Sequence, residues 1–409
     1  EYYGAINNTS SGGTIKIQSS NFDGNLNTRT IYNTAENAVL IVNNSTFSNN
    51  INTNSTEAGT GPGNSAAIYS GGMGYSNNSA IAYNSSFLNN QSTITGATYG
   101  VATVNSIYKG NSSTNAIGAS SGGNTFNSIF ENNTAGTEGG AGSFGTISNS
   151  EFTGNTAGQK GGAVSRQDGN LHVLSSVFTN NKTTDTTAED GITYGGGAIF
   201  YYATTDEAKN QYQLLVNNST FTGNVAALAG GSAIRNIRGT VNIDGSTFSS
   251  NGNNSVTNIN GGTMTVNNSL FENNYGSAIS NYIGSTLTVN NSTFTGNYGT
   301  SGAAIINDRD SSVATINSSR FFDNYIYTDS MEYRWQFAGG AIYSHSGTTP
   351  NAQSYANVNN SIFKGNLGQQ GGAIYGNVGI NGSIFDSNGI CEKAWGQSTD
   401  KSGAVLVHS

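Results

Sequence analysis

The chain has 409 residues, among them 56 Gly and 2 Pro, and its formal net charge is −8. Charged residues make up 9% and hydrophobic residues 34%, against about 25% and about 45–50% in ordinary soluble domains. A nucleic-acid-binding surface needs clustered Lys and Arg, and the sequence has no basic run, which excludes nucleic acid as a partner. No apolar stretch approaches the roughly 18 residues of a membrane-spanning helix, and the one cysteine, Cys391, excludes an intrachain disulfide.

One pattern, Ser-x-Phe-x-x-Asn, recurs fourteen times along the chain, once with Tyr in place of Phe. The position five residues before the ring is apolar in twelve copies and Thr in the other two. Most steps between rings are 21–27 residues, the length of one coil of a parallel β-helix. The aromatic anchors are Phe22, Phe47, Phe87, Tyr108, Phe130, Phe152, Phe178, Phe221, Phe248, Phe271, Phe294, Phe321, Phe363 and Phe385.

A second motif, small residues followed by Ala-Ile or Ala-Val, lies between the anchors, as in residues 161–164 and 371–374. Short segments in which apolar and polar residues alternate, such as residues 263–267, predict β-strands, and no segment shows the apolar periodicity of a helix. The sequence therefore predicts an all-β fold, a parallel β-helix (solenoid) of about fourteen coils that forms a single domain over residues 1–409.

The repeat also predicts where its side chains point. We expect the ring, the aliphatic residue before it and the Ile of Ala-Ile to fill the narrow interior of each coil. The serine before the ring is expected to face outward. The asparagine after the ring is expected to sit at a corner in the left-handed backbone conformation, which Asn tolerates.

The two tetrapeptides Phe-x-x-Asn and Gly-Gly-Ala-Ile/Val resemble those of the chlamydial polymorphic outer-membrane proteins and, more widely, of autotransporter adhesin passengers. The resemblance covers roughly residues 15 to 390. It implies a right-handed β-helix that is exported to a bacterial surface and used for attachment. Members of that family end in a membrane β-barrel that this sequence lacks, so we expect either a released or truncated passenger or a chain with another fate.

Three steps between anchors are longer, at 40, 43 and 42 residues. They predict loop insertions at about residues 51–64, 182–213 and 325–356, and such loops often carry the binding face. The third insertion either exposes a patch suited to sugars or proteins, or folds back on the flank of the coil. Its five aromatic residues are Tyr325, Tyr327, Tyr333, Trp335 and Phe337.

Two further groups of residues are candidates for ligand binding. Tyr343 and Tyr375 follow Ala-Ile in the same register and either bind a glycan along the coil or tile its surface. Asp308 and Asp310 are two apart, so we expect them to share a strand face, and Arg235 lies at a similar place in an earlier coil. This set is either a polar column or a solvated face.

The sequence thus predicts a non-enzymatic adhesin at the bacterial cell surface or in the extracellular space. Its expected partners are a host surface glycan, a matrix protein or other copies of itself. We predict no catalytic residue and no cofactor. We also predict no metal site, because His172, His345 and His408 are scattered without ligand spacing. Two alternatives stay open: a filament subunit joined end to end through unpaired strand edges, and a polysaccharide-active β-helix enzyme that uses convergent carboxylates.

Overall fold

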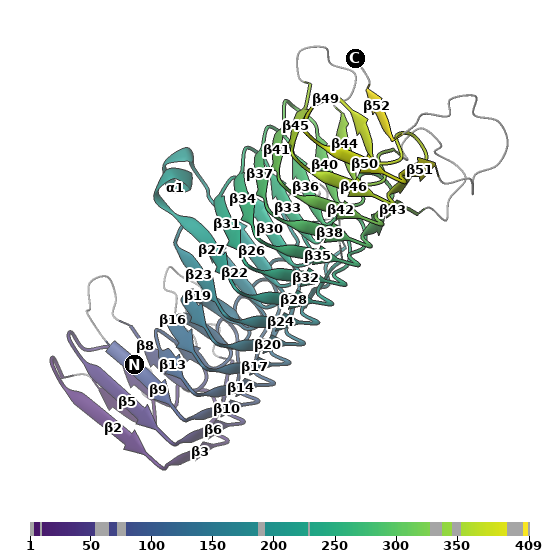
Figure 1. The fold of residues 1–409 in the computed structure, drawn as a ribbon. Coiled ribbons are helices and arrows are strands. Elements are labelled where there is room, and N and C mark those ends of the chain that lie inside the picture. Colours follow the sequence, from purple (N-terminus) through teal and green to yellow (C-terminus); the bar gives the residue numbers. More distant parts are fainter. Residues whose placement is uncertain are drawn as a thin grey trace. The chain divides into compact units, whose positions relative to one another are not determined.

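The structure is a computed structural model that describes residues 4–8, 10–53, 65–71, 79–186, 193–227, 230–327, 338–345, 353–390 and 404–407. Parallel strands stack coil upon coil and confirm the predicted β-helix (Figure 1). Contacts divide the chain into two compact units. Unit 1 comprises Glu1–Arg166, Asn170–Thr187 and Gly196–Phe200, and unit 2 comprises Gln167–Gly169, Ala188–Gly195 and Tyr201–Ser409. The prediction of one domain over residues 1–409 stays a prediction.

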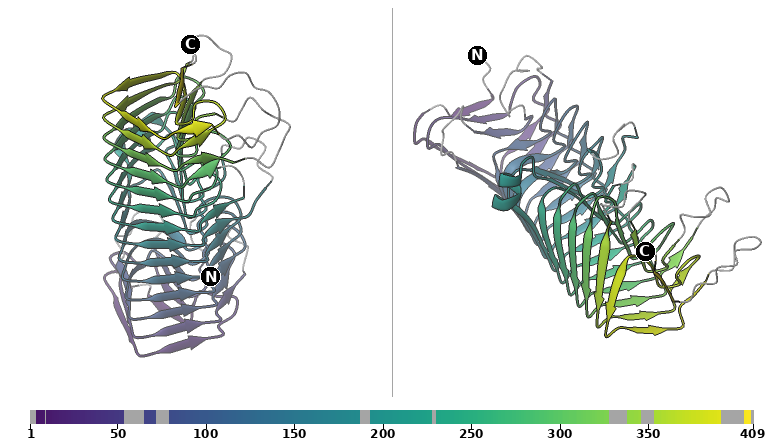
Figure 2. Two further views of the ribbon diagram at one scale, coloured as in Figure 1. Left: turned by 45° about the vertical axis from the view of Figure 1, so that its right-hand side comes forward. Right: turned by 90° about the horizontal axis from the view of Figure 1, so that it is seen from above.

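Each unit contains seven of the anchor strands, three residues long, with the ring in the middle, and Figure 2 shows how such strands pile up within a unit. In unit 1 they are β3 (Asn21–Asp23), β6 (Thr46–Ser48), β10 (Ser86–Leu88), β14 (Ile107–Lys109), β17 (Ile129–Glu131), β20 (Glu151–Thr153) and β24 (Val177–Thr179). In unit 2 they are β28 (Thr220–Thr222), β32 (Thr247–Ser249), β35 (Leu270–Glu272), β38 (Thr293–Thr295), β42 (Arg320–Phe322), β46 (Ile362–Lys364) and β50 (Ile384–Asp386).

A second set of strands follows the Ala-Ile motif. These are β1 (Ile6–Asn8), β4 (Ile31–Asn33), β8 (Ile68–Ser70), β12 (Thr98–Tyr99), β16 (Ser120–Phe126), β19 (Gly142–Ser148), β22 (Val164–Gln167), β26 (Ile199–Tyr202), β30 (Ile234–Ile237), β33 (Val256–Ile259), β36 (Ile279–Tyr282), β40 (Ile305–Asp308), β44 (Ile342–His345), β48 (Ile374–Gly376) and β52 (Val405–Val407).

A third set precedes each anchor and carries the residue five positions before the ring, which is aliphatic in most coils. These are β2 (Thr14–Gln18), β5 (Val39–Asn43), β9 (Ser79–Tyr83), β13 (Ala102–Val104), β23 (Leu171–Leu174), β27 (Gln213–Asn217), β31 (Thr240–Asp244), β34 (Thr263–Asn267), β37 (Thr286–Asn290), β41 (Val313–Asn317), β45 (Tyr355–Asn359) and β49 (Val378–Asn381). In two coils of unit 1, the long strands β16 and β19 supply both this set and the previous one.

Short strands of two residues follow the anchors and complete the coils. They are β7 (Ile51–Asn52), β11 (Gln91–Ser92), β15 (Ser112–Ser113), β18 (Thr134–Ala135), β21 (Thr156–Ala157), β25 (Lys182–Thr183), β29 (Val225–Ala226), β39 (Tyr298–Gly299), β43 (Tyr325–Ile326), β47 (Leu367–Gly368) and β51 (Gly389–Ile390).

The rings stack inside each unit as predicted. Neighbouring centroids lie 4.5–5.2 Å apart in unit 1, from Phe22 to Phe178. They lie 4.6–4.9 Å apart in unit 2, from Phe221 to Phe385. This spacing follows from the roughly 4.8 Å between paired strands. Tyr108 replaces Phe where the inward Ile becomes Thr98, and its hydroxyl lies 3.1 Å from the Thr98 hydroxyl.

The serine before each ring does not face outward, which corrects the prediction. Residues two apart lie on the same face of a strand, so the serine is buried with the ring, as at Ser106 and Ser128. The Ser128 Oγ accepts a hydrogen bond from the Ser106 backbone N–H (3.1 Å), and the Ser106 Oγ donates to the Val104 carbonyl (2.9 Å). The hydroxyls thus bond the backbone within and between coils.

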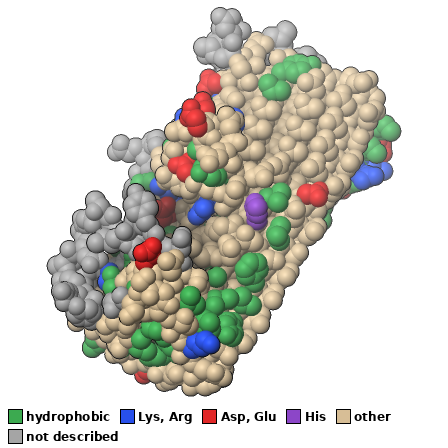
Figure 3. All heavy atoms as spheres, turned by 90° about the vertical axis from the view of Figure 1, so that its left-hand side faces the viewer, with side chains coloured by type: hydrophobic (Ala, Val, Ile, Leu, Met, Phe, Trp, Pro, Cys, Tyr) green, Lys and Arg blue, Asp and Glu red, His purple; other side chains and the backbone are tan. Residues whose placement is uncertain are grey.

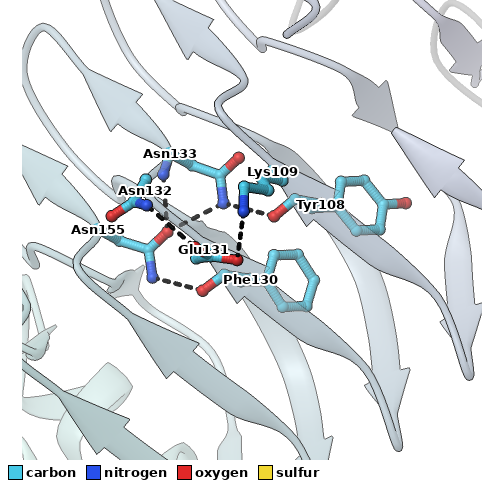
Figure 4. Close-up of polar contacts among 7 residues, drawn as sticks. All are labelled: Tyr108, Lys109, Phe130, Glu131, Asn132, Asn133 and Asn155. Atoms are coloured by element: carbon cyan, nitrogen blue, oxygen red, sulfur yellow. Dashed lines mark hydrogen bonds and ion pairs between the residues drawn. The ribbon is translucent and has the colours of Figure 1, made fainter. Parts of the chain in front are cut away.

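The asparagine after the ring is also buried, except for the half-buried Asn25 and Asn388 of the first and last anchors, and it is not the left-handed residue that the sequence predicts. Asn133 donates from Nδ2 to the Tyr108 carbonyl (3.0 Å) and to Asn155 Oδ1 (2.9 Å), and the same pattern recurs from coil to coil (Figure 4). The left-handed residues stand just before it and three residues before each ring, as at Asn132 and Asn127 with φ of 54° and 50°. These two corners bracket each anchor strand.

The insertions are described in part. In the second, the short helix α1 (Asp206–Gln211) begins at Thr205, whose Oγ1 accepts from the Ala208 N–H at 3.1 Å. In the third, β43 and β44 lie within the described residues. Residues 54–64, 328–337 and 346–352 lie outside them.

Candidate acid–base cluster

Charged side chains are few on the face drawn in Figure 3, which consists mostly of polar uncharged side chains and backbone. Unit 2 contains a group of ionisable side chains that come together on neighbouring strands. The adjacent parallel strands β36, β40 and β44 bring Tyr282, Asp308 and His345 into one register. Each is the third residue after an inward-facing Ile, so the coil places all three in one column.

A second column lies two residues earlier on the same strand face. In it Tyr343 pairs in register with Tyr375 of β48, and Arg235 stands at the start of the same column, in β30. The rings of Tyr343 and Tyr375 stack at 5.6 Å with planes 9° apart. His345 meets both rings edge-on, at 6.1 Å and 6.0 Å. The predicted shared register of Tyr343 and Tyr375 is confirmed.

The two tyrosines of this second column stay protonated far above neutral pH. Burial raises the pKa of Tyr343, and the nearby carboxylate of Asp308 raises that pKa further. Burial also raises the pKa of Tyr375. Both phenols are therefore proton donors, and the imidazole of His345 lies beside them.

Asp308 is half-buried, and its burial raises the pKa of its carboxyl. Three influences oppose this shift: the Arg309 backbone N–H, which donates to Asp308 Oδ1 at 2.8 Å, and the charges of Arg309 and His345. Burial outweighs them, so the carboxyl holds its proton more strongly than a solvated aspartate does.

Arg309 brings a permanent positive charge to the same place. Its guanidinium carbon lies 5.9 Å from the centre of the Tyr282 ring. Burial is the main cause that raises the pKa of Tyr282 to about 12; the Asp308 charge adds to the rise, and a hydrogen bond with Ser280 and the charges of Arg309 and Arg235 oppose it. We call Tyr282, Asp308, Arg309, Tyr343 and His345 the acid–base cluster.

The turn after Asp308 holds three consecutive non-glycine residues in the left-handed region. Arg309, Asp310 and Ser311 have φ of 65°, 51° and 62°. The Ser312 Oγ donates to the carbonyls of Asp308 (3.1 Å) and Arg309 (2.9 Å) and so ties the turn together. Backbone strain of this kind is often found at functional sites. It also corrects one prediction: β40 ends at Asp308, so Asp310 lies in the turn and does not share a strand face with it.

Arg235 is 1% exposed, and two glycines make room for it. A Cβ at Gly230 would lie 2.3 Å from Arg235 Nη1, and one at Gly195 would lie 3.0 Å from its Cδ. The charge of Arg235 lowers the pKa of Tyr282, so this buried cation acts on the acid–base cluster. Among the predicted residues, the structure thus brings Asp308, Tyr343 and Tyr375 together, whereas Arg235 stands in the column of Tyr343 but four strands before it.

The remaining predicted residues belong elsewhere or lie outside the described residues. Tyr325 and Tyr327 are 38% and 47% exposed. The ring of Tyr325 stacks on that of Tyr298 at 5.6 Å, on the separate sheet of short strands. Tyr333, Trp335 and Phe337 lie outside the described residues.

Sequence reasoning missed Tyr282, Arg309 and His345 as site residues. A signal for two of them was available, because Tyr282 and His345 stand three residues after Ile279 and Ile342, as Asp308 does after Ile305. Arg309 gives no such signal, since only the left-handed turn puts its guanidinium beside the Tyr282 ring.

In the described part of the chain, no group of three His, Cys, Asp or Glu residues is placed to hold a metal ion. No helix within the same residues is long and apolar enough to cross a membrane.

No protein-family model and no curated protein matches this sequence. Among solved structures, the A-module of the mannuronan C-5 epimerase AlgE6 from Azotobacter vinelandii is similar over 91% of each chain, with 11% identity and a TM-score of 0.36. A PL6 alginate lyase in complex with a trisaccharide has 9% identity and a TM-score of 0.32, over 93% of this chain and 79% of its own. The alginate lyase AlyF-OU02 with G6 has 10% identity and a TM-score of 0.36, over 93% and 80%.

This comparison corrects the prediction of a non-enzymatic adhesin. The three similar structures named above are an epimerase and two lyases, which are polysaccharide-processing enzymes.

Proposed function

We propose that this chain is a polysaccharide-active enzyme whose reaction centre is the acid–base cluster. The observation that supports it is the register of Tyr282, Asp308 and His345, which gathers a phenol, a carboxyl and an imidazole on three adjacent strands. The pKa values of the first two are raised there, mainly by burial. Ionisable groups whose pKa values are displaced together are typical of catalytic sites.

The side chains of the cluster divide the work of an acid–base reaction. His345 is the proton acceptor, because histidine is the side chain that most often serves as a general base. Tyr343 is the proton donor, because burial keeps its phenol protonated. Arg309 binds an anionic group of the substrate, since its guanidinium stays charged at every relevant pH.

These roles fit β-elimination in a uronate polymer. His345 takes the proton from the sugar carbon next to the carboxylate, which Arg309 neutralises. The electron pair left on that carbon forms a double bond as the bond to the glycosidic oxygen breaks, and Tyr343 protonates the leaving oxygen. Return of a proton to the opposite face of the same carbon, without bond cleavage, would instead epimerise the sugar.

The test incubates the full chain with a panel of uronate polymers that includes alginate. Ultraviolet absorbance of the new double bond reports elimination, and reducing ends without that absorbance report hydrolysis. An NMR spectrum of the polymer reports epimerisation. We expect His345→Gln and Tyr343→Phe each to lower the rate roughly 10²- to 10⁴-fold, the usual contribution of general acid–base catalysis.

Tyr298→Phe is the matched control, because Tyr298 is a tyrosine of unit 2 that stacks on Tyr325 on another sheet. It should retain the full rate. Unchanged turnover in His345→Gln, or no change in any polymer of the panel with the intact chain, would contradict the proposal. The extracellular location, the partners and the resemblance to surface passengers are untested and stay predictions.

A further inference from the structure

Unit 1 contains an open cavity of about 360 Å³, formed by residues that play no part in the acid–base cluster. Gly100, Gly122 and Gly145 contribute backbone to its lining, so no side chain of theirs obstructs it. Gly100 and Gly122 have φ of 68° and 84°, a conformation that suits glycine. A side chain at either position would therefore strain the backbone.

The cavity occupies a position in the coils of unit 1 that is filled by asparagine side chains in the coils of unit 2. In unit 2, Asn258, Asn281 and Asn307 stand two residues after an inward Val or Ile. Each amide donates to a nearby carbonyl and to the next polar side chain of the column. Gly100 and Gly122 occupy the corresponding register in unit 1, two residues after Thr98 and Ser120. Loss of the amide side chains leaves that corner open.

Arg166 is the one charged side chain among the residues that line the cavity. Its Nε is buried and has no hydrogen-bond partner among the described residues. Arg166 forms no ion pair with a described carboxylate, in contrast to Lys109 with Glu131 and Lys364 with Asp386. An unbalanced, partly buried cation favours an anion from outside.

Asn124 supplies a second polar group in the lining. Its Oδ1 accepts a hydrogen bond from the Thr146 backbone N–H at 2.9 Å, which fixes the orientation of the amide. The Nδ2 donor of Asn124 is left for a ligand. With Arg166, the cavity therefore offers a forked cation and an amide donor, and no acidic side chain lines it.

We propose that this cavity binds the carboxylate of an acidic sugar residue, with Arg166 as the anion-binding group and Asn124 as an additional donor. Its volume lies near the lower end of the ~300–1,000 Å³ of small-molecule sites, which suits a single sugar. The choice of a sugar rests on the proposed function, whereas anion binding at Arg166 rests on the cavity alone.

The experiment titrates the full chain with glucuronate and with glucose and measures binding by calorimetry. Binding needs no turnover, so its result is separate from that of the activity assay. We expect glucuronate to bind and glucose to bind at least tenfold more weakly. Arg166→Gln should weaken glucuronate binding roughly ten- to hundredfold, the effect of losing a charge-assisted hydrogen bond.

Two further variants make the result specific. Lys109→Gln removes one positive charge from the surface of the same unit, where Lys109 pairs with Glu131 at 3.0 Å, and should leave binding unchanged. Ala102→Glu places a carboxylate in the cavity lining as an internal partner for Arg166 and should abolish binding. Circular dichroism checks that each variant is folded.

Equal affinity of glucose and glucuronate, or undiminished glucuronate binding in folded Arg166→Gln or Ala102→Glu, would overturn the assignment. If glucuronate binds through Arg166 while no uronate polymer is converted, the site stands and the proposed enzymatic function fails.

Discussion

At the scale of single residues, buried polar side chains hold the coils together. Asn133 bonds the coil before it through the Tyr108 carbonyl and the coil after it through Asn155 Oδ1. Its own Oδ1 accepts from Asn111 Nδ2 at 3.0 Å. Amide ladders thus help to stabilise a chain that has few large apolar side chains. They supply hydrogen-bond donors to backbone carbonyls that would otherwise be buried without partners.

Asn133→Ala is expected to lower the free energy of unfolding by roughly 2–6 kcal/mol, because at least two buried groups lose their partners at about 1–3 kcal/mol each. Chemical denaturation of the variant measures this loss. Asn115→Ala, at an exposed position of the same unit, is the control and should change stability little. Equal stabilities of the two variants would show that the ladder contributes nothing.

Asp308 makes stability depend on pH in a predictable direction. Burial raises the pKa of its carboxyl above the ordinary 3.8, so the folded chain binds this proton more tightly than the unfolded chain. As the pH rises from 3.8 through the raised pKa, ionisation of Asp308 therefore lowers the stability of the folded state.

Asp308→Asn removes this cost, so we expect a higher melting temperature than that of the native chain at pH 7, with a smaller difference below pH 4. Thermal unfolding across that range measures it. Asp310→Asn, at the exposed position two residues on, should not produce the same pH-dependent gain. A lower melting temperature of Asp308→Asn at pH 7 would contradict the assignment of the raised pKa.

At the scale of elements, the anchor strands fix the spacing of everything else. Left-handed residues stand at both of their ends, and the ring between them stacks on the rings of the neighbouring coils. This geometry holds the Ala-Ile strands of successive coils in register, even where the coils contain 26 and 37 residues, as around Asn307. The acid–base cluster depends on that register.

Phe271→Ala should cost about 3–5 kcal/mol of unfolding free energy, the usual loss for a buried aromatic ring. The ring is fully buried between Phe248 and Phe294, at 4.7 Å and 4.8 Å. Phe385→Ala is the control, since the Phe385 ring is half-buried and stacks on Phe363. Denaturation should show a clearly smaller loss for it; equal losses would contradict the importance of the stack.

At the scale of the whole molecule, each unit is a stack of coils, and a coil contacts mainly its neighbours. The stability of such repeat architectures is close to a sum of contributions from each coil and from its contacts with the next coil. A destabilising substitution should therefore affect its own coil and the adjacent coils most. Where a substitution falls should therefore matter as much as what it removes.

We expect Phe271→Ala to speed amide hydrogen exchange most in β32, β35 and β38, with an effect that falls with distance along unit 2. Phe152→Ala should do the same around β17, β20 and β24 of unit 1. Exchange measured by mass spectrometry on both variants tests this. Uniformly faster exchange over all described strands would mean that the chain unfolds as one cooperative body.

The sequence by itself determined the coil, the stacked rings and the common register of Tyr343 and Tyr375, because a repeat of one residue type at one spacing leaves a single way to bury the rings. It did not determine the direction of the Asn side chain. The serine follows from strand parity, but the burial of Asn133 depends on carbonyls of the neighbouring coils.

Only the tertiary structure decided the acid–base cluster and the cavity at Arg166. Tyr282, Asp308 and His345 lie in coils of unequal length, and strand pairing alone brings them together. The guanidinium of Arg309 lies beside Tyr282 because of a left-handed turn, which the spacing of the repeat does not predict. The physical reason is that the raised pKa values and the unpaired Arg166 nitrogen arise from burial, and burial is a property of the assembled coils.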